Sequence, residues 1–332
     1  MEPVSLVFPL CNEANSLEVL YHQVVEACGQ ARVDPQLVFV DDGSTDQSLA
    51  VIKQLRSRDP RVVYVSLSRN FGHQNALVAG MTAATGSAVI TMDADLQHPP
   101  SLLPQMIALW REGIEVVYTT KREARLPPVK AFVVKLFYRL LSRLSGLQFE
   151  FGQSDFRLLD RKVADVILGM PEYHKFLRGQ VKWVGFSQRG LAYDVEARHS
   201  GESKFTYRRL FGLALDGLLS FSRYPLRLVT IVGTVVSSLS VLYVVFIIGL
   251  AVAHGFGWLR EILLPPGWAT LAVSILFLGS MQVVVMGVLA EYLGRVYEQT
   301  KGRPNFIIRE RSDQTCAWPG EAPSVSMHAR NA

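Results

Sequence analysis

Two long stretches without charge dominate the C-terminal half of this 332-residue chain. Residues 228–257 and 262–290 contain no Asp, Glu, Lys or Arg. Each stretch is longer than the roughly 20 residues that an α-helix needs to cross a bilayer. The alternative is a buried helical hairpin of a soluble protein, which the length of both stretches disfavours. We therefore expect two transmembrane helices, at about residues 228–253 and 268–290.

The charges that flank these stretches predict their orientation. Cations gather before the first stretch and after the second, at Arg208, Arg209, Arg223, Arg227, Arg295, Lys301 and Arg303. The loop between the stretches offers only Arg260, beside Glu261. Because Lys and Arg concentrate in cytoplasmic loops, both termini are expected in the cytoplasm. The N-terminus resembles no signal peptide, so we predict a multi-pass protein of the inner (cytoplasmic) membrane with its first domain in the cytoplasm.

The first part of the chain alternates short apolar runs with amphipathic helical stretches. The expected strands are residues 4–10, 36–42, 62–68, 87–95 and 114–120. Strands that are buried on both faces and separated by helices indicate an α/β domain with a mostly parallel sheet. Ligands of such sheets bind at the carboxyl ends of the strands. Polar clusters follow four of these strands, at residues 12–15, 41–46, 68–73 and 93–98.

Two stretches of the middle of the chain, residues 129–144 and 205–221, read as helices whose wide apolar faces are broken by cations. Such helices can lie in a membrane interface with their cations among lipid phosphates, or they can pack on the sheet as amphipathic helices. We place both in an N-terminal cytoplasmic domain, residues 1–225. A membrane domain, residues 226–292, and a C-terminal tail, residues 293–332, complete the chain, and the tail is expected to be disordered from about Ser312.

The strongest candidate for a cation site is Asp93-Ala94-Asp95. These two carboxylates end an apolar strand, where they can reach a hard cation such as Mg²⁺ or Mn²⁺ together with a diphosphate. A solvated loop or a helix cap is the alternative for an isolated triplet of this kind. The formal net charge of +5 suits a partner that carries phosphate.

Further polar residues lie on the same rim of the sheet. Asp41 and Asp42 follow the second strand, and Glu13 lies shortly after Pro9 in the first. Acidic groups there can accept hydrogen bonds from a ribose or a base, although the segment after Asp41 can equally be a plain strand-to-helix connection. Neither G-x-G-x-x-G nor a P-loop motif occurs, so a dinucleotide site and ATP hydrolysis of those types have no support.

Together with Asn70-Phe71-Gly72, these motifs resemble the family 2 inverting glycosyltransferases of the GT-A fold. The resemblance is to the polyprenyl-phosphate branch, which includes dolichol-phosphate mannose synthase and GtrB-like enzymes, and it covers about residues 4–310. Further matches are residues 155–161, 178–179, 183–186, 198 and 201–204. The resemblance implies a Rossmann-like GT-A domain with a mostly parallel sheet, followed by the two membrane helices.

The same resemblance implies roles for individual residues. It implies a nucleotide-sugar pocket and a site for Mg²⁺ or Mn²⁺, the latter at Asp93, Asp95 and Gln97. The pocket residues are Pro9, Glu13, Asp41, Asp42 and Asp93. The cations implied to bind the acceptor phosphate are Lys121, Arg122, Arg125, Arg198 and Lys204, of which the last two can instead be solvated charges near the membrane.

Asp155 and Asp95 are the candidate catalytic residues. The resemblance makes Asp155 a general base or a positioning group. Asp155 can equally anchor Arg157 or another neighbouring cation through a structural ion pair. A phosphate monoester is already an anion at neutral pH, since its second pKa is about 6, so the attack needs little help from a base.

The resemblance implies transfer of one sugar per turnover, with inversion, from a nucleotide sugar to a polyprenyl phosphate at the cytoplasmic face of the membrane. Glucose from UDP-glucose and undecaprenyl phosphate are the expected pair, for glycan, lipopolysaccharide or cell-envelope modification. One alternative is a membrane-anchored glycosyltransferase with a non-lipid acceptor, and another is a non-enzymatic lipid carrier or flippase component. Two spans give little material for a lipid pathway unless a homo-oligomer forms. We expect no nucleic-acid partner.

Overall fold

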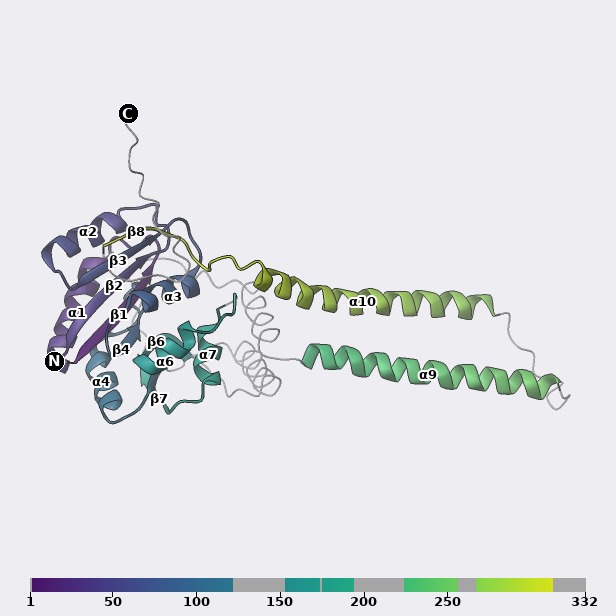
Figure 1. Ribbon diagram of the computed structural model, residues 1–332. Helices are drawn as coiled ribbons and strands as arrows, with labels where there is room; N and C mark the ends of the chain where they lie inside the picture. Colours follow the sequence, from purple (N-terminus) through teal and green to yellow (C-terminus); the bar gives the residue numbers. More distant parts are fainter. Residues whose placement is uncertain (1, 122–152, 174, 194–223, 256–266, 313–332) are drawn as a thin grey trace, which may run out of the picture. The chain divides into compact units, whose positions relative to one another are not determined.

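The computed structural model describes residues 2–121, 153–173, 175–193, 224–255 and 267–312 (Figure 1). These residues fall into two compact units. One unit contains the described residues up to 193 together with 303–312, and the other contains the described residues 224–255 and 267–302. The two predicted interfacial helices, residues 129–144 and 205–221, lie outside the described residues.

The first unit is built on one eight-stranded sheet with the order β7-β5-β6-β4-β1-β2-β3-β8 (Figure 1). Its strands are β1 (Pro3–Leu10), β2 (Asp34–Asp41), β3 (Val62–Leu67), β4 (Ala88–Thr91), β5 (Val116–Lys121), β6 (Gln153–Asp160), β7 (Gln188–Tyr193) and β8 (Ile308–Arg311). The central strands β3, β2, β1 and β4 run parallel, as do β5 and β7. The predicted α/β class with a mostly parallel sheet is thus confirmed.

Helices cover both faces of this sheet and account for its apolar strands. Three of them share one core cluster with the sheet, namely α1 (Leu17–Ala31), α2 (Ser48–Arg58) and α4 (Leu103–Arg111), which follows the 3₁₀ turn η1 (Pro100–Leu102). The opposite cluster contains residues of α3 (His73–Ala83), α6 (Arg161–Leu168) and α7 (Leu177–Trp183). Gly80 lets α3 lie close to β1, because a Cβ atom there would collide with Val7. Burial on both faces explains why the strands read as continuous apolar runs.

β6 was not among the predicted strands, and it runs antiparallel between β4 and β5. Its sequence carries Ser154, Asp155 and Arg157, all of which are buried. The strand brings these polar side chains beside the carboxyl end of β4, because Thr91 pairs with Arg157. This antiparallel strand therefore adds charged groups to the edge at which the parallel strands end.

The last strand, β8, follows the second long helix and returns to the sheet. It pairs antiparallel to β3. Glu310 of β8 forms an ion pair with Lys53 at 2.7 Å and accepts a hydrogen bond from the Tyr64 hydroxyl at 2.8 Å. Ser312 and Tyr64 also exchange hydrogen bonds at 2.9 and 3.0 Å. Residues 308–311 are thus part of the sheet, which the polar sequence of this segment did not predict.

The described residues of the second unit form two long helices, α9 (Tyr224–Gly255) and α10 (Trp268–Thr300). They occupy the two stretches in which long helices were predicted. Within the described residues, one helical stretch is long and apolar enough to cross a membrane, Phe277–Thr300 in α10. The apolar stretch Val229–Tyr243 in α9 is shorter. Large apolar side chains such as Leu239 and Val283 are exposed along these helices.

Candidate active site

The loops that follow β1 and β2 are fastened to each other at the carboxyl edge of the sheet. Asn12 adopts a left-handed conformation with φ of 61°, which asparagine tolerates better than most residues. Its side-chain oxygen accepts hydrogen bonds from the backbone N–H groups of Thr45 at 2.8 Å and Asp46 at 3.3 Å. The backbone N–H of Glu13 donates to Ser48 Oγ at 2.9 Å. Glu13 is half-buried on this rim, whereas Pro9 is buried within β1.

The buried carboxylates Asp41 and Asp42 both hold loops of the site. Asp41 Oδ1 accepts the Ser44 backbone N–H at 2.9 Å, and its Oδ2 accepts the Ser66 hydroxyl at 2.9 Å. Asp42 accepts the backbone N–H groups of Phe71 at 2.7 Å and Gly72 at 3.0 Å. These bonds engage all four carboxylate oxygens, which fits the strand-to-helix connection considered above. Contact with a nucleotide stays a prediction for both residues.

The pKa of Asp42 reflects this burial. Burial raises the pKa above its usual value, although the N–H groups of Phe71 and Gly72 act in the opposite direction. Gly43 follows directly with φ of +70°, and a Cβ atom there would lie 2.6 Å from the backbone of Arg69 and Asn70. Only glycine therefore fits between the loop after β2 and the loop after β3.

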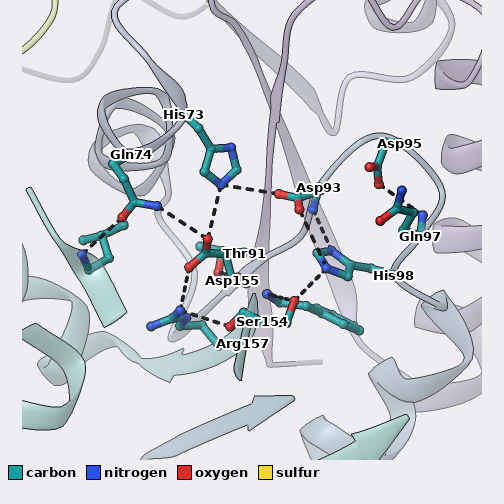
Figure 2. Close-up of polar contacts among 12 residues, drawn as sticks. His73, Gln74, Thr91, Asp93, Asp95, Gln97, His98, Ser154, Asp155 and Arg157 are labelled. Carbon is teal, nitrogen blue, oxygen red and sulfur yellow. Dashed lines mark hydrogen bonds and ion pairs between the residues drawn. The ribbon is translucent and has the colours of Figure 1, made fainter. Parts of the chain in front are cut away.

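The turn of residues 93–97 follows β4 and carries Asp93 and Asp95 (Figure 2). We call it the cation turn, after the cation site predicted there. Leu96 turns the chain with φ of 62°, and Asp95 Oδ1 accepts the Gln97 backbone N–H at 3.1 Å. The Asp93 backbone N–H donates to Nδ1 of His98 at 3.1 Å. The structure thus places Asp93, Asp95 and Gln97 in one turn, and their binding of a cation stays a prediction. No role for His98 was predicted.

The oxygen atoms of this turn fit a hard divalent cation. Asp93 Oδ1 is shielded from solvent and accepts no hydrogen bond within the described part of the chain, and its described charged neighbour is the His73 imidazole, whose Nε2 lies 3.5 Å away. Among the residues that the structure describes, no three His, Cys, Asp or Glu side chains form a metal-binding group. The turn therefore offers two carboxylates, and the remaining ligands of a cation would be oxygen atoms of a bound diphosphate or water. This donor set matches the preference of Mg²⁺ and Mn²⁺.

Asp155 lies on the side of Asp93 opposite Asp95 and is surrounded by cationic side chains (Figure 2). Arg178 binds it with two hydrogen bonds, from Nε at 3.0 Å and from Nη2 at 2.8 Å. Arg157 Nη2 donates to Asp155 Oδ1 at 2.7 Å, and His73 Nε2 lies 3.6 Å from Oδ2. We call these four residues the Asp155 cluster. His73 Nε2 also lies 3.5 Å from Asp93 Oδ1, so the cluster adjoins the cation turn (Figure 2).

The charges of the Asp155 cluster determine its protonation. Burial alone would raise the pKa of the Asp155 carboxyl, but its cationic partners, Arg178 first, outweigh burial and hold the pKa well below the usual value. Burial would likewise lower the pKa of His73, but Asp155 and Asp93 outweigh it and raise that pKa. Asp155 is therefore an ionised carboxylate that resists protonation. A carboxylate of this kind is a weak general base.

The predicted phosphate-binding cations are only partly described. Lys121 ends β5 and is half-buried. Burial lowers the pKa of His98, and the positive charge of Lys121 acts in the same direction. The other four predicted cations, Arg122, Arg125, Arg198 and Lys204, lie outside the described residues. Arg178 was predicted only as part of a motif, and no role was predicted for His73, because the sequence around each residue gives no local sign of its ion pairs.

Comparison with known proteins identifies the family. Residues 5–168 match Glycosyl transferase family 2. An uncharacterized glycosyltransferase of Synechocystis is 39% identical over 92% of this chain and 95% of its own length. A prophage bactoprenol glucosyl transferase homolog of Escherichia coli is 37% identical over 92% of this chain and 98% of its own. The bactoprenol glucosyl transferase of Shigella phage SfX is 37% identical over 93% and 99%, respectively.

Among solved structures, glucosyl-3-phosphoglycerate synthase from Mycobacterium tuberculosis, in complex with Mn²⁺, UDP and phosphoglyceric acid, aligns with a TM-score of 0.45 and 20% identity. The alignment covers 66% of this chain and 76% of that chain. The sheet described above is the Rossmann-like α/β arrangement of the GT-A fold. The chain matches the family model, and it is 37–39% identical to glycosyltransferases over more than nine-tenths of their length. It therefore belongs to glycosyl transferase family 2.

Proposed function

We propose that this protein transfers glucose from UDP-glucose to a polyprenyl phosphate, with undecaprenyl phosphate as the natural acceptor. The observation that carries the proposal is the similarity, at 37% identity over more than nine-tenths of both chains, to proteins named bactoprenol glucosyl transferase. Two further features support it. One is the cation turn with the adjoining Asp155 cluster, and the other is the pair of long helices. The glucosylated lipid would supply glucose for modification of a glycan, lipopolysaccharide or another cell-envelope component.

The proposed reaction is one in-line displacement. An oxygen of the acceptor phosphate forms a bond to the anomeric carbon of glucose. The bond from that carbon to the UDP oxygen breaks, and its electron pair leaves with UDP, so the anomeric configuration inverts. The acceptor phosphate is already an anion at neutral pH, and the attack requires no proton transfer to the protein.

Asp93 and Asp95 would hold the Mg²⁺ or Mn²⁺ ion, with Gln97 beside them in the same turn. A bound divalent cation would offset the negative charge that develops on the departing diphosphate. Pro9, Glu13, Asp41 and Asp42 are proposed to shape the nucleotide pocket. For Asp41 and Asp42 the support is indirect, because their carboxylates hold the loops of the pocket.

We assign Asp155 the role of an anchor and not of a base. Its carboxylate oxygens are engaged by two arginines, and its pKa is held well below the usual value. A fixed carboxylate of this kind orients Arg178, whose side chain is 32% exposed. Arg178 would thus present positive charge to an anionic substrate group beside the cation turn.

We further propose that α9 and α10 both span the membrane, with both termini in the cytoplasm. The apolar stretch in α10 and the cations that flank both helices support this topology. An acceptor phosphate stays at the headgroup layer while its tail remains in lipid, so a membrane-bound enzyme meets it by diffusion in two dimensions. The proposed ligands of that phosphate are the cations Lys121, Arg122, Arg125, Arg198 and Lys204.

The test is a transfer assay with the full-length protein in membranes or detergent. Undecaprenyl phosphate is incubated with a panel of radiolabelled nucleotide sugars, with and without Mg²⁺ or Mn²⁺. We expect a lipid-extractable product from UDP-glucose that needs the cation, and we expect the Asp93→Asn variant to lose it. If no nucleotide sugar of the panel gives a lipid-linked product, the proposed function is wrong. Transfer to a water-soluble acceptor at an equal rate would instead favour a non-lipid acceptor.

A further inference from the structure

His98 connects the cation turn to the strand that carries Asp155. The side chain is 1% exposed and lies between the two segments in Figure 2. On one side, its Nδ1 accepts the backbone N–H of Asp93 at 3.1 Å. On the other side, its Nε2 lies 2.7 Å from Ser154 Oγ on β6. A single imidazole thus touches the backbone of one proposed cation ligand and the residue that precedes Asp155.

These contacts fix the tautomer of the ring. A nitrogen that accepts a hydrogen bond from a backbone N–H carries no proton, so the proton of the neutral imidazole is on Nε2. The Nε2–H group then donates to Ser154 Oγ at 2.7 Å, while Asp93 Oδ2 lies farther away at 3.7 Å. Both ring nitrogens are therefore used, one as an acceptor and one as a donor.

The surrounding side chains hold the ring in this orientation. The imidazole stacks on Phe156 with ring centres 5.3 Å apart and 24° between the planes. The Tyr193 ring meets it edge-on at 6.1 Å, and the Tyr193 hydroxyl lies 3.5 Å from Ser154 Oγ. Ser154 Oγ also accepts the backbone N–H of Phe156 at 3.2 Å. The ring cannot rotate without losing these contacts, so its Nδ1 is a fixed acceptor.

We propose that His98 is a positioning residue of the cation site, which acts by holding the Asp93 backbone through Nδ1 so that the carboxylates of Asp93 and Asp95 face a bound divalent cation. The proposal rests on the proposed function, because it takes the turn to be a cation site. In this role His98 acts through the Asp93 backbone and is itself neither a cation ligand nor a catalytic residue. Without the imidazole, the Asp93 N–H would lose its acceptor at the start of a turn that also contains the left-handed Leu96. An unpaired N–H of this kind favours a different turn conformation.

The competing explanation is that His98 only fills space between β4 and β6. Two substitutions separate the explanations. In His98→Asn, the side-chain amide reaches the place of Nδ1, and it can accept the Asp93 N–H. In His98→Gln, the amide reaches the place of Nε2 and can contact Ser154, but nothing replaces the Nδ1 acceptor. Both variants are polar and smaller than histidine, so packing alone predicts no advantage for asparagine.

The experiment measures the dissociation constant of Mn²⁺ for the full-length protein in detergent with UDP, by electron paramagnetic resonance of free Mn²⁺. Wild type, His98→Asn, His98→Gln and Ser154→Ala are compared, and thermal unfolding confirms that each is folded. We expect His98→Gln to raise the dissociation constant about 10- to 100-fold, as loss of a residue behind a metal ligand does. His98→Asn is expected to bind more tightly than His98→Gln. Ser154→Ala, which keeps the Nδ1 contact, is expected to have the smallest effect.

Met106→Ala is the matched control for lost packing, because Met106 is fully buried in the same core cluster as Phe156. It should lower the melting temperature and leave Mn²⁺ affinity unchanged. Equal Mn²⁺ affinity in wild type and His98→Gln would overturn the proposal, and so would tighter binding by His98→Gln than by His98→Asn. Absence of Mn²⁺ binding by wild type would overturn both the proposal and the cation site. Normal Mn²⁺ binding without glucosyl transfer would overturn the proposed acceptor reaction alone.

Discussion

Replacing Asp155 by Asn tests whether this carboxylate is an anchor or a base. The substitution keeps the size of the side chain but removes its charge, which leaves Arg157, 2% exposed, without its carboxylate partner. Breaking a buried ion pair by removing one partner costs about 3–5 kcal/mol of unfolding free energy. For a domain of this size, that corresponds to a melting temperature lower by roughly 6–20 °C. Thermal unfolding of the full-length protein in detergent measures the shift.

The pH dependence of this shift has a definite sign. The pKa of Asp155 in the folded protein is held well below its usual value of 3.8. A lowered pKa means that the stabilisation is present above the unfolded-state pKa and is lost as pH falls through the folded-state pKa. The difference in melting temperature between wild type and Asp155→Asn should therefore be constant near neutral pH. It should shrink only below about pH 4.

Two further variants complete the test. Asp165→Asn breaks an exposed ion pair with Arg161, at 3.4 Å, and should change stability by less than about 0.5 kcal/mol. The double variant Asp155→Asn/Arg157→Met removes the orphaned charge as well and should recover part of the lost stability. An Asp155→Asn protein with the melting temperature of wild type, but with turnover reduced more than about 100-fold, would refute the anchor role and restore the general base.

Other parts of the structure make separate predictions. Gly43→Ala should lower the unfolding free energy by about 2 kcal/mol or more and weaken UDP binding, because a Cβ at φ of +70° meets the Arg69 backbone. Gly29→Ala, in an open part of α1, should instead raise the unfolding free energy by about 0.5–1 kcal/mol. Asp59→Asn should cost about 1–2 kcal/mol of unfolding free energy at pH 7, because Arg61, which is 39% exposed, lowers the pKa of Asp59 to about 2. This difference in stability should vanish as pH falls from about 4 to 2. Unfolding curves measure these three variants. Chelation with EDTA should abolish transfer and added Mn²⁺ should restore it; activity that persists in EDTA would contradict the cation site.

The central sheet was predictable because its signals are local. Apolar runs such as residues 4–10 and 62–68, each followed by a helical pattern, predict buried parallel strands wherever they occur. β6 and β8 were not predicted, because neither has the apolar pattern of a buried strand. β6 buries Asp155 and Arg157, which no hydrophobic pattern indicates, and these charges are tolerated only because they pair with each other and with Arg178. β8 is short and polar, and its partner strand lies far away in sequence.

The site was predictable in position but not in detail. The rule that ligands bind at the carboxyl ends of parallel strands gathers Asp41, Asp42, Asp93 and Asp95 on one edge before any coordinate is known. The same rule does not reveal that the carboxylate oxygens of Asp41 and Asp42 accept hydrogen bonds from neighbouring loops and strands. That distinction depends on tertiary hydrogen bonds. The open choice for Asp155, between base and anchor, likewise required its distances to two arginines.

The return of β8 to β3 has a consequence for biosynthesis. Tyr64 and Glu310, which join the two strands, are separated by 246 positions in the chain. At a translation rate of about 5–20 residues per second, roughly 10–50 s pass between synthesis of the two strands. During that time both long helices emerge from the ribosome, while the edge of β3 has no partner. An unpaired strand edge invites association with other chains. A nascent protein stalled after α10 should therefore be more prone to aggregation and proteolysis than the finished chain.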